Sequence, residues 1–391
     1  MSSEAGKLEP AAQRAVASGA ASTTSSRLAS IDVFRGATIA AMILVNGQYS
    51  AESSYRQLAH AEWNGWTFAD TIFPCFLFIV GVSMTLSTAS RVARGEARGQ
   101  LFIHAARRAL LLFACGVVID YLRIPAAGFP FVGVQDHLQL SGVLQKIAAC
   151  YLAAFFVFLW MGRRGAIAAI VGLNLLHLGL LFLFPVPGCG AGSLDASCNF
   201  PGYLDQLVLN GFRWNSGAFD PDGLGTVLPA TTSVLFGVLA GQLLPSGERP
   251  GERILRLVGG GLLLLGAGVL LSAWVPIMKP LWTPSYAVFM AGLAAIGLAL
   301  TLWLVDGGGA VARRWLRPLA VLGRNAIAAY LVSRLVANVL RVHVLGRSLH
   351  DDLFAAIFSP ATASLLFATL VLAIVFVAIS AMDRRGWHLR F

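Results

Sequence analysis

A histidine and two other polar residues stand at the ends of long apolar stretches. Asn46 closes one stretch, His60 lies in the polar connection after it, and Asp70 opens the next stretch. A neutral imidazole, whose ordinary pKa is about 6.5, can accept a proton near neutral pH, and a carboxylate can orient its ring. Gln145 and Lys146 stand at a comparable depth in a later stretch. These five residues predict one polar cluster suited to acid–base chemistry.

A second polar cluster is expected at the opposite ends of the apolar stretches. Asp32 and Arg35 are three residues apart and so share one face of a helix, while Arg324 and Asn325 occur early in another stretch. Polar residues inside a bilayer are costly and usually face a cavity or a partner. Either the two clusters form a site, or they are hydrogen bonds and ion pairs that hold helices together.

The composition places both clusters in an integral membrane protein. Hydrophobic residues make up 57% of the chain and charged residues only 12%, whereas soluble proteins carry about 25% charged residues. The mean hydropathy is +0.72, and the 41 glycines suit helices that pack closely in lipid. We expect an all-α polytopic fold of about ten transmembrane helices, over residues 31–49, 68–88, 101–121, 139–160, 165–185, 225–244, 254–274, 284–304, 318–340 and 360–382.

The distribution of Lys and Arg predicts the orientation of these helices. Basic residues concentrate in both terminal tails and in alternate connections, such as 89–108 and 305–317, so both termini are expected to be cytoplasmic. The net charge of +10 is then mostly a topology signal, and no nucleic-acid partner is expected. Residues 1–26 form an Ala/Ser-rich tail without a signal-peptide pattern, which we expect to be disordered. The membrane domain would cover 27–391.

Two of the five cysteines share a long connection that this topology places outside. Cys189 and Cys198 lie within residues 186–224, and an oxidising periplasm would favour a disulfide between them. A zinc site would need further ligands, and this connection contains no histidine. No metal is predicted. The other cysteines are expected to pack inside spans as small apolar residues: Cys75, Cys115 and Cys150.

Six motifs, in order, resemble bacterial relatives in the heparan-α-glucosaminide N-acetyltransferase family, a branch of the transmembrane acyltransferases. The resemblance runs from Arg27 to the C-terminus. The motifs are "RLASIDVFRGATIAAMILVN" (27–46), "HAEWNGWTFADTIFPCFLFIVGVS" (60–83), "SGVLQKIAACY" (141–151), "FDPDGLGTVLPA" (219–230), "KPLWTPSYAV" (279–288) and "GRNAIAAY" (323–330).

This resemblance implies transfer of an acetyl group from cytoplasmic acetyl-CoA to an amino sugar across the membrane. The family's essential histidine matches His60, and its nearby asparagine and aspartate match Asn46 and Asp70. His60 would take the proton of the acceptor amine, or would itself carry the acetyl group as an acyl-imidazole. Asp70 would orient the ring, and Asn46 would donate to the developing oxyanion.

Three residues near His60 are candidates for binding the acceptor. Trp63 and Trp66 offer ring faces against which a pyranose could lie, and Asn64 stands between them. The alternative is that the two tryptophans anchor the mouth of the helix in the membrane interface.

The other polar cluster would hold the anionic phosphates of acetyl-CoA. Guanidinium forks match phosphate geometry, and from Arg35 to Asn46 a helix rises about 16 Å, a gap that the extended arm of coenzyme A can bridge. The predicted donor site comprises Asp32, Arg35, Gln145, Lys146, Arg324 and Asn325.

Two other classes of function remain open. A secondary transporter of a sugar or acylated sugar would also have polar clusters at two depths, although no internal repeat relates the two halves. A membrane sensor or scaffold would need no histidine at the mouth of a helix. We therefore predict an acyltransferase of the bacterial inner membrane, embedded in lipid, with a glucosamine-type acceptor. The sequence does not identify the acceptor or decide whether the chain forms a homo-oligomer.

Overall fold

The computed structural model describes residues 29–50, 52–121, 139–209, 219–244, 249–341 and 350–389. Within these ranges the chain is helical and has no β-strand, only isolated β-bridges. The all-α prediction is therefore confirmed for this part of the chain. The tail 1–26, predicted to be disordered, lies outside the described residues.

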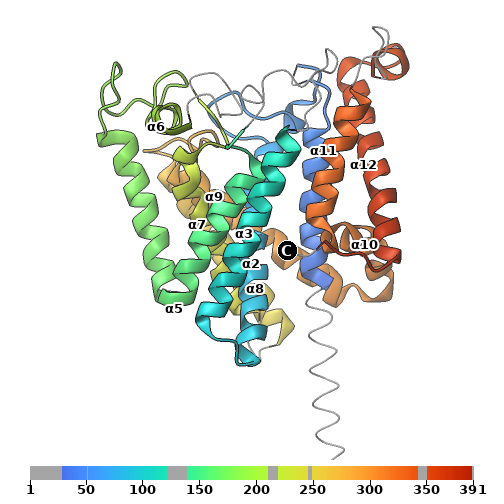
Figure 1. The fold of residues 1–391 in the computed structure, drawn as a ribbon, viewed down its shortest axis with the longest axis horizontal. Coiled ribbons are helices and arrows are strands. Elements are labelled where there is room, and N and C mark those ends of the chain that lie inside the picture. The colour runs from blue at the N-terminus through green and yellow to red at the C-terminus, as the bar shows by residue number, and fades with distance from the viewer. Residues whose placement is uncertain are drawn as a thin grey trace, which may run out of the picture.

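Eight described helices are long and apolar enough to cross a membrane, or up to nine if one bent pair counts as a span (Figure 1). This confirms a polytopic helical architecture, whereas the count of ten and the sides of the termini stay predictions. The candidate spans are the first helix (Ala29–Asn46), α2 (Phe68–Ala93), α3 (Arg98–Tyr121), α5 (Val143–Leu183), η2 (Leu224–Thr226) with α7 (Val227–Leu243), α8 (Pro250–Leu271), α9 (Pro284–Gly307) and α12 (Pro360–Arg384).

Helix α5 is twice as long as one membrane crossing requires. Its 41 residues would extend about 60 Å as one straight helix. Gly162 interrupts it with φ 60° and ψ −155°, a conformation that is open to glycine because it lacks a Cβ. Figure 1 shows two arms that meet at the α5 label. The segments predicted as 139–160 and 165–185 are thus joined by a tight turn.

The segment predicted as one span over 318–340 is two helices in the structure. Helix α10 (Gly309–Arg324) and α11 (Ala326–Leu340) meet at 80°. Asn325 between them has φ −119° and ψ 37°, which is not helical. The early part of α10 exposes Val311 and Trp315, whereas its last turn is buried. Hydropathy alone missed the bend because the apolar pattern continues across Asn325.

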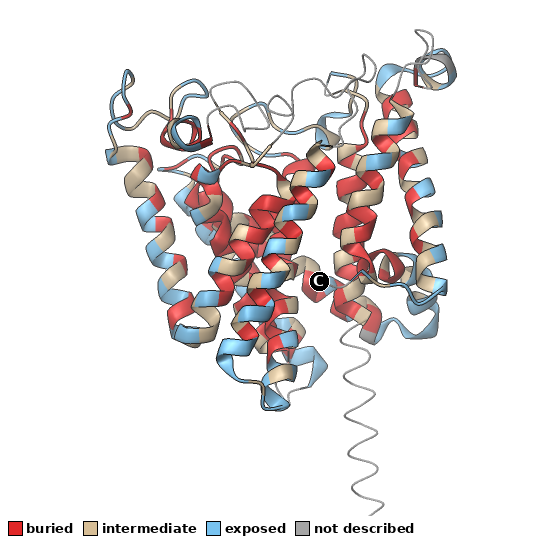
Figure 2. Ribbon diagram, viewed as in Figure 1, coloured by how far each residue is buried: buried red, intermediate tan, exposed pale blue. Residues whose placement is uncertain are grey.

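The spans divide into an interior and a periphery. Of the apolar window in η2 and α7, 72% is buried, against 17% in α8; the first helix, α2 and α9 also belong to the interior, and α3, α5 and α12 to the periphery. Figure 2 shows exposed residues along the outer arm of α5. The exposed side chains of the peripheral helices include Leu175, Leu263 and Val377, which are suited to lipid contact.

A close crossing of α2 and α7 fixes the position of α2. A Cβ at Gly81 would overlap the carbonyl oxygen of Val234, and one at Gly237 would overlap that of Phe78. Only glycine permits two helix backbones to approach this closely. Because α2 begins just before Asp70, this crossing also fixes where the Asp70 carboxylate lies.

Three short helices that the sequence did not predict lie outside the long spans: η1 (Arg56–Leu58), α6 (Phe200–Leu209) and the π-helix η3 (His350–Ala355). Helix α6 and the connection before α2 lie at the same end of the bundle (Figure 1). We call this the His60 end, and the opposite end, where α10 meets α11, the Arg324 end.

Candidate functional site at the His60 end

The N-terminus of α2 positions Asp70. Thr67 is the N-cap and Asp70 the third helical residue, and together they form a capping box. Asp70 Oδ2 accepts hydrogen bonds from the backbone nitrogens of Thr67 and Ala61, both at 3.0 Å. A carboxylate here also gains from the positive end of the helix dipole. The side chain is only 1% exposed, so the local fold holds this charge in place.

His60 is bound to the other oxygen of this carboxylate. Its Nδ1 lies 2.8 Å from Asp70 Oδ1, while 49% of its side chain is exposed. A carboxylate oxygen accepts, so Nδ1 carries the proton and donates it. In a neutral ring Nε2 then keeps a lone pair. The pair can therefore act as an oriented general base that solvent and substrate can reach.

Lys279 lies against both His60 and Asp70, although the sequence did not predict it as a site residue. Its Nζ lies 3.2 Å from Asp70 Oδ1 and 3.0 and 3.4 Å from His60 Nδ1 and Nε2. Because Nδ1 carries the proton, the ring can accept a hydrogen bond from this ammonium only at Nε2, the longer of the two contacts. Burial lowers the pKa of Lys279, and the nearby carboxylates of Asp70 and Asp222 partly oppose this. The motif "KPLWTPSYAV" contained the residue, but only the fold brings it to His60.

Two polar connections meet to form this site. The backbone nitrogen of Gly65 donates to the carbonyl of Ile277 at 3.0 Å, which joins the His60 connection to the one carrying Lys279. Within the latter, the hydroxyls of Thr283 and Ser285 both donate to the carbonyl of Pro276, at 2.8 and 2.9 Å. His60 and Lys279 are thus held by backbone contacts as well as by Asp70.

Trp63, Asn64 and Trp66 differ in how far they are engaged by the protein. The indole nitrogen of Trp63 donates to the carbonyl of Leu194 at 2.8 Å, and its ring packs edge-on against Phe219. Trp66 is 41% exposed, and Asn64 is exposed as well. Trp63 therefore fastens the connection, which leaves Trp66 and Asn64 as the outward-facing candidates for binding the acceptor.

Asn46 is not joined to His60 or Asp70 by any hydrogen bond among the described residues. Its backbone carbonyl accepts a hydrogen bond from the guanidinium of Arg341 at 3.2 Å, at the end of the first helix. The predicted oxyanion role of the Asn46 amide has no contact in this structure that supports it, and stays a prediction.

Lys146 lies fully buried behind the site and holds the segment 219–226. Its Nζ donates to the carbonyl of Pro221 at 2.9 Å and to the hydroxyl of Thr226 at 2.6 Å, and it lies 4.6 Å from the ring centroid of Trp282. The preceding residue, Gln145, donates from Nε2 to Asp120 Oδ2 at 3.1 Å. Both residues thus have protein partners near the His60 end, away from the other predicted donor-binding residues.

At the Arg324 end the predicted arginines are also paired within the protein. Arg35 donates to Asp32 Oδ1 at 3.2 Å, to the carbonyl of Gly323 at 3.1 Å and to Ser83 Oγ at 2.7 Å. Ser83 lies about 20 Å along α2 from Asp70. The structure therefore brings Asp32 and Arg35 together and places them well away from His60.

Arg324 uses both arms of its guanidinium on one carboxylate. Nε and an η nitrogen donate to the two oxygens of Asp383 at 3.0 and 2.7 Å. The side chain of Asn325 contacts His388 Nδ1 at 3.2 Å and accepts from the backbone nitrogen of Leu389 at 3.3 Å. The Arg324 guanidinium, predicted to bind phosphate, is therefore already paired with a carboxylate of α12. Asn325 joins the C-terminal segment to the α10–α11 bend by hydrogen bonds.

The sequence matches a family model described as heparan-alpha-glucosaminide N-acetyltransferase, catalytic, over residues 27–271, more than half of the chain. The chain belongs to this family. The human heparan-alpha-glucosaminide N-acetyltransferase is 28% identical over 367 residues, covering 80% of this chain and 53% of the human protein. The mouse protein of the same name is 27% identical over 371 residues, covering 81% and 54%. The chain thus spans about half the length of these curated relatives.

The match to the heparan-alpha-glucosaminide N-acetyltransferase model covers only part of the site. His60 and Asp70 lie inside residues 27–271, whereas Lys279 and Arg324 lie beyond them. Among the described residues, no group of three or more His, Cys, Asp or Glu side chains could hold a metal. The groups that meet at the His60 end are an imidazole, a carboxylate and an ammonium.

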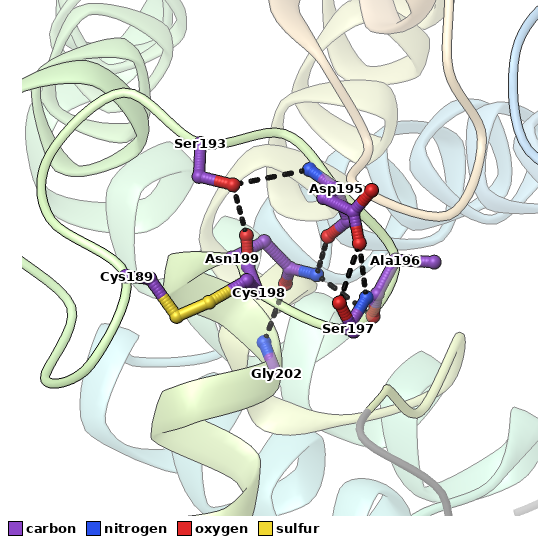
Figure 3. The surroundings of a disulfide bond; sticks show 8 residues. All are labelled: Cys189, Ser193, Asp195, Ala196, Ser197, Cys198, Asn199 and Gly202. Carbon is purple, nitrogen blue, oxygen red and sulfur yellow. Dashed lines mark hydrogen bonds between the residues drawn. A yellow bond between two sulfur atoms is a disulfide. The ribbon is translucent and has the colours of Figure 1, made fainter.

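In this family member a disulfide links Cys189 and Cys198, whose Cα atoms are 6.1 Å apart (Figure 3). Ser193 Oγ donates to the carbonyl of Cys198 at 2.6 Å, and Asn199 accepts from the backbone nitrogen of Gly202 at 2.8 Å. These bonds connect the closed loop to α6. Leu194 within the loop accepts the hydrogen bond from Trp63, so the disulfide loop supports the His60 connection.

Proposed function

We propose that this chain is a membrane-bound acetyltransferase that moves an acetyl group from acetyl-CoA to the amine of a glucosamine-type sugar. The observation that carries the proposal is the half-exposed His60 ring oriented by a buried Asp70, in a chain whose family is named for N-acetyl transfer to a glucosaminide. An imidazole of this kind matches the proton transfer that amide formation requires.

In the simplest route the amine nitrogen attacks the thioester carbon while His60 Nε2 takes a proton from that nitrogen. The carbonyl π electrons move to oxygen, then return as the carbon–sulfur bond breaks. The thiolate leaves with the bond's electrons and takes the proton from the imidazolium, giving the amide and the free thiol. Asp70 stabilises the imidazolium between these events, since it accepts from Nδ1–H throughout.

A second route uses His60 as the nucleophile. Nε2 attacks the thioester carbon, and the thiolate leaves with the electrons of the carbon–sulfur bond, while Nδ1–H stays bonded to Asp70. The amine then attacks the acetyl carbon, the imidazole leaves with the electrons of the carbon–nitrogen bond, and the proton lost by the amine protonates the thiolate. Both routes need an unprotonated Nε2 and an ionised Asp70. A stable acyl-enzyme that forms with acetyl-CoA alone, detected as a mass increase on the His60 peptide, would favour the second route.

We further propose that the chain crosses the bacterial inner membrane ten times, with the His60 end periplasmic and the Arg324 end cytoplasmic. Counting the two arms of α5 separately and the bent α10–α11 pair as one span gives this number from the helices of the structure. The basic connections on the Arg324 side support the orientation. Acetyl-CoA would then enter from the cytoplasm, and the acceptor from the periplasm.

Purified protein incubated with acetyl-CoA and a panel of amino sugars tests the reaction directly. We expect N-acetylated glucosamine or a glucosamine-containing oligosaccharide by mass spectrometry, together with one equivalent of free thiol. The variant His60→Ala provides the background rate. Uptake of a sugar into proteoliposomes without acetylation of any member of the panel would overturn the proposal in favour of a transporter.

A further inference from the structure

We propose that Lys279 binds the carbonyl oxygen of the acetyl group and stabilises the negative charge that this oxygen gains in the transition state. The inference rests on the proposed acetyl transfer at His60. It assigns the oxyanion contact to a residue of the α8–α9 connection, in place of Asn46.

The position of the Lys279 ammonium relative to Nε2 carries the inference. A reacting amine must lie within hydrogen-bond distance of Nε2, about 3 Å, and the thioester carbon must be next to that amine. Lys279 Nζ is 3.4 Å from Nε2. The carbonyl oxygen on a thioester carbon next to that amine therefore lies within reach of the N–H groups of Lys279. No other ammonium or guanidinium is hydrogen-bonded to His60 among the described residues.

Lys279 has donors to spare for this contact. An ammonium has three N–H groups, and one is accounted for by Asp70 Oδ1 at 3.2 Å. Among the described residues, the remaining contacts are those with the His60 ring, which can accept only at Nε2, 3.4 Å away, so a third N–H group remains. The Lys279 side chain is 17% exposed, so a substrate oxygen can approach it. The Asn46 side chain, by contrast, has no hydrogen bond to His60 or Asp70 among the described residues.

The connection that carries Lys279 is held in place by a backbone hydrogen bond and a buried aromatic ring. The backbone nitrogen of Trp282 donates to the carbonyl of Lys279 at 3.0 Å. Trp282 itself has φ 48°, a left-handed conformation that costs free energy in a residue with a Cβ and persists where the surroundings impose it. Its ring is buried and packs edge-on against Phe73 and Tyr286. A donor held in advance in this way stabilises charge without reorganising during the reaction.

Among the charged groups in contact with His60 in the described part of the chain, only the Lys279 ammonium can donate to a negative oxygen. Asp70 and Asp222 are the carboxylates that act on Lys279. Asp70 accepts hydrogen bonds from His60, Ala61 and Thr67, and an ionised carboxylate has no proton with which to stabilise an oxyanion.

Steady-state kinetics of the full-length protein in detergent test the assignment. Lys279→Met should lower kcat by about 10² to 10³, the usual loss for one oxyanion donor, with the KM for acetyl-CoA and for glucosamine changed less than about threefold. Lys279→Arg keeps a cationic donor and should recover part of the lost kcat. Ser272→Ala, in the same connection, serves as the matched control, since it removes a hydroxyl whose described hydrogen bond is to the carbonyl of Val269.

Melting temperature and gel filtration establish that each variant is folded, and Lys279→Gln replaces Lys279→Met if the latter is not. A variant that is folded and keeps wild-type kcat would overturn the oxyanion assignment alone. So would equal losses for Lys279→Met and Lys279→Arg with a matching loss of melting temperature, since this is the result of a structural role. If the wild-type protein acetylates no amino sugar, the proposed function itself fails and the inference falls with it.

Discussion

The two ends of the helical bundle use charged residues in different ways. At the His60 end one buried carboxylate contacts a histidine, a lysine and two backbone donors, and the histidine remains half exposed, with Nε2 contacted among the described residues by Lys279 alone. At the Arg324 end the guanidinium groups of Arg35 and Arg324 are bonded to carboxylates, a carbonyl and a hydroxyl of the protein. Charged side chains at helix ends therefore suggest a site, but uncommitted donors and acceptors distinguish a reactive site from an ion pair that fastens helices.

Replacing His60 should have the largest effect, because no other described side chain offers an oriented imidazole to the acceptor. His60→Ala should lower turnover by at least about 10² to 10⁴, the usual contribution of general acid–base catalysis. Acetyl-CoA affinity, measured by calorimetry on the same preparation, should stay nearly intact. His104→Ala is the control, since His104 is exposed on α3 and its ring contacts the carbonyl of Gln100 in its own helix. Wild-type turnover in His60→Ala would show that His60 is not needed for the reaction and that the His60 end is not the reactive end.

Asp70→Asn tests whether the carboxylate, and not merely its shape, makes the His60 end reactive. An amide at this position lacks the charge that stabilises the imidazolium, and it can present the wrong group to Nδ1–H. We expect turnover to fall by about 10²-fold, together with a lower melting temperature because the capping box is weakened. Asp195→Asn, an exposed carboxylate in the disulfide loop, should change neither property. A variant that is folded and fully active would show that His60 needs no anionic partner.

A buried carboxylate behind the His60 end predicts a pH dependence of stability. Burial raises the pKa of Asp205 to about 6 from its usual 3.8, although its hydrogen bond from Gly225 opposes this. Between these values the folded state holds a proton that the unfolded state releases, so the free energy of unfolding should fall as pH rises from 3.8 to 6. The whole shift corresponds to at most about 3 kcal/mol.

The difference in melting temperature between wild type and Asp205→Asn isolates this group from other titrations. The amide can keep the contact with Gly225 through its oxygen and does not ionise, so the advantage of wild type at pH 4 should shrink by pH 6.5. A difference that is constant across this range would show that Asp205 is ionised throughout.

Much of the fold follows from sequence because lipid imposes a simple rule on it. A stretch of about 20 apolar residues must be a helix in a bilayer, so the predicted 68–88 and 360–382 fall within α2 and α12. The break between the predicted 139–160 and 165–185 was also found, because Arg163 and Arg164 interrupt the apolar pattern next to Gly162. The 80° bend at Asn325 was not predicted, because hydropathy continues through it, and the bend depends on contacts with other helices and on single backbone dihedral angles.

The proximity of His60 and Asp70 could be predicted because the two residues are close in the sequence. His60 and Asp70 are ten residues apart, so one connection and one helix N-terminus suffice to bring them together. Lys279 is 219 residues from His60, and no local pattern reveals that the α8–α9 connection returns to the same place. For Arg324 the residue type suggested phosphate binding, but its carboxylate partner on α12, 59 residues away, became evident only in three dimensions.

Substitutions at the Arg324 end should have the smallest effects on activity. They test whether Arg324 binds the donor or only pairs with Asp383. If Arg324 binds the phosphates of the donor, it must exchange Asp383 for them, and Arg324→Ala should weaken acetyl-CoA binding by about 1.5 to 3 kcal/mol. Asp383→Asn should then leave binding unchanged or tighter, because it frees a guanidinium that the carboxylate now holds at 2.7 and 3.0 Å. Calorimetry with the two variants separates these outcomes. If both variants instead lose melting temperature equally and bind acetyl-CoA like the wild type, the pair only fastens α10 to α12, and the donor phosphates must bind to other cations.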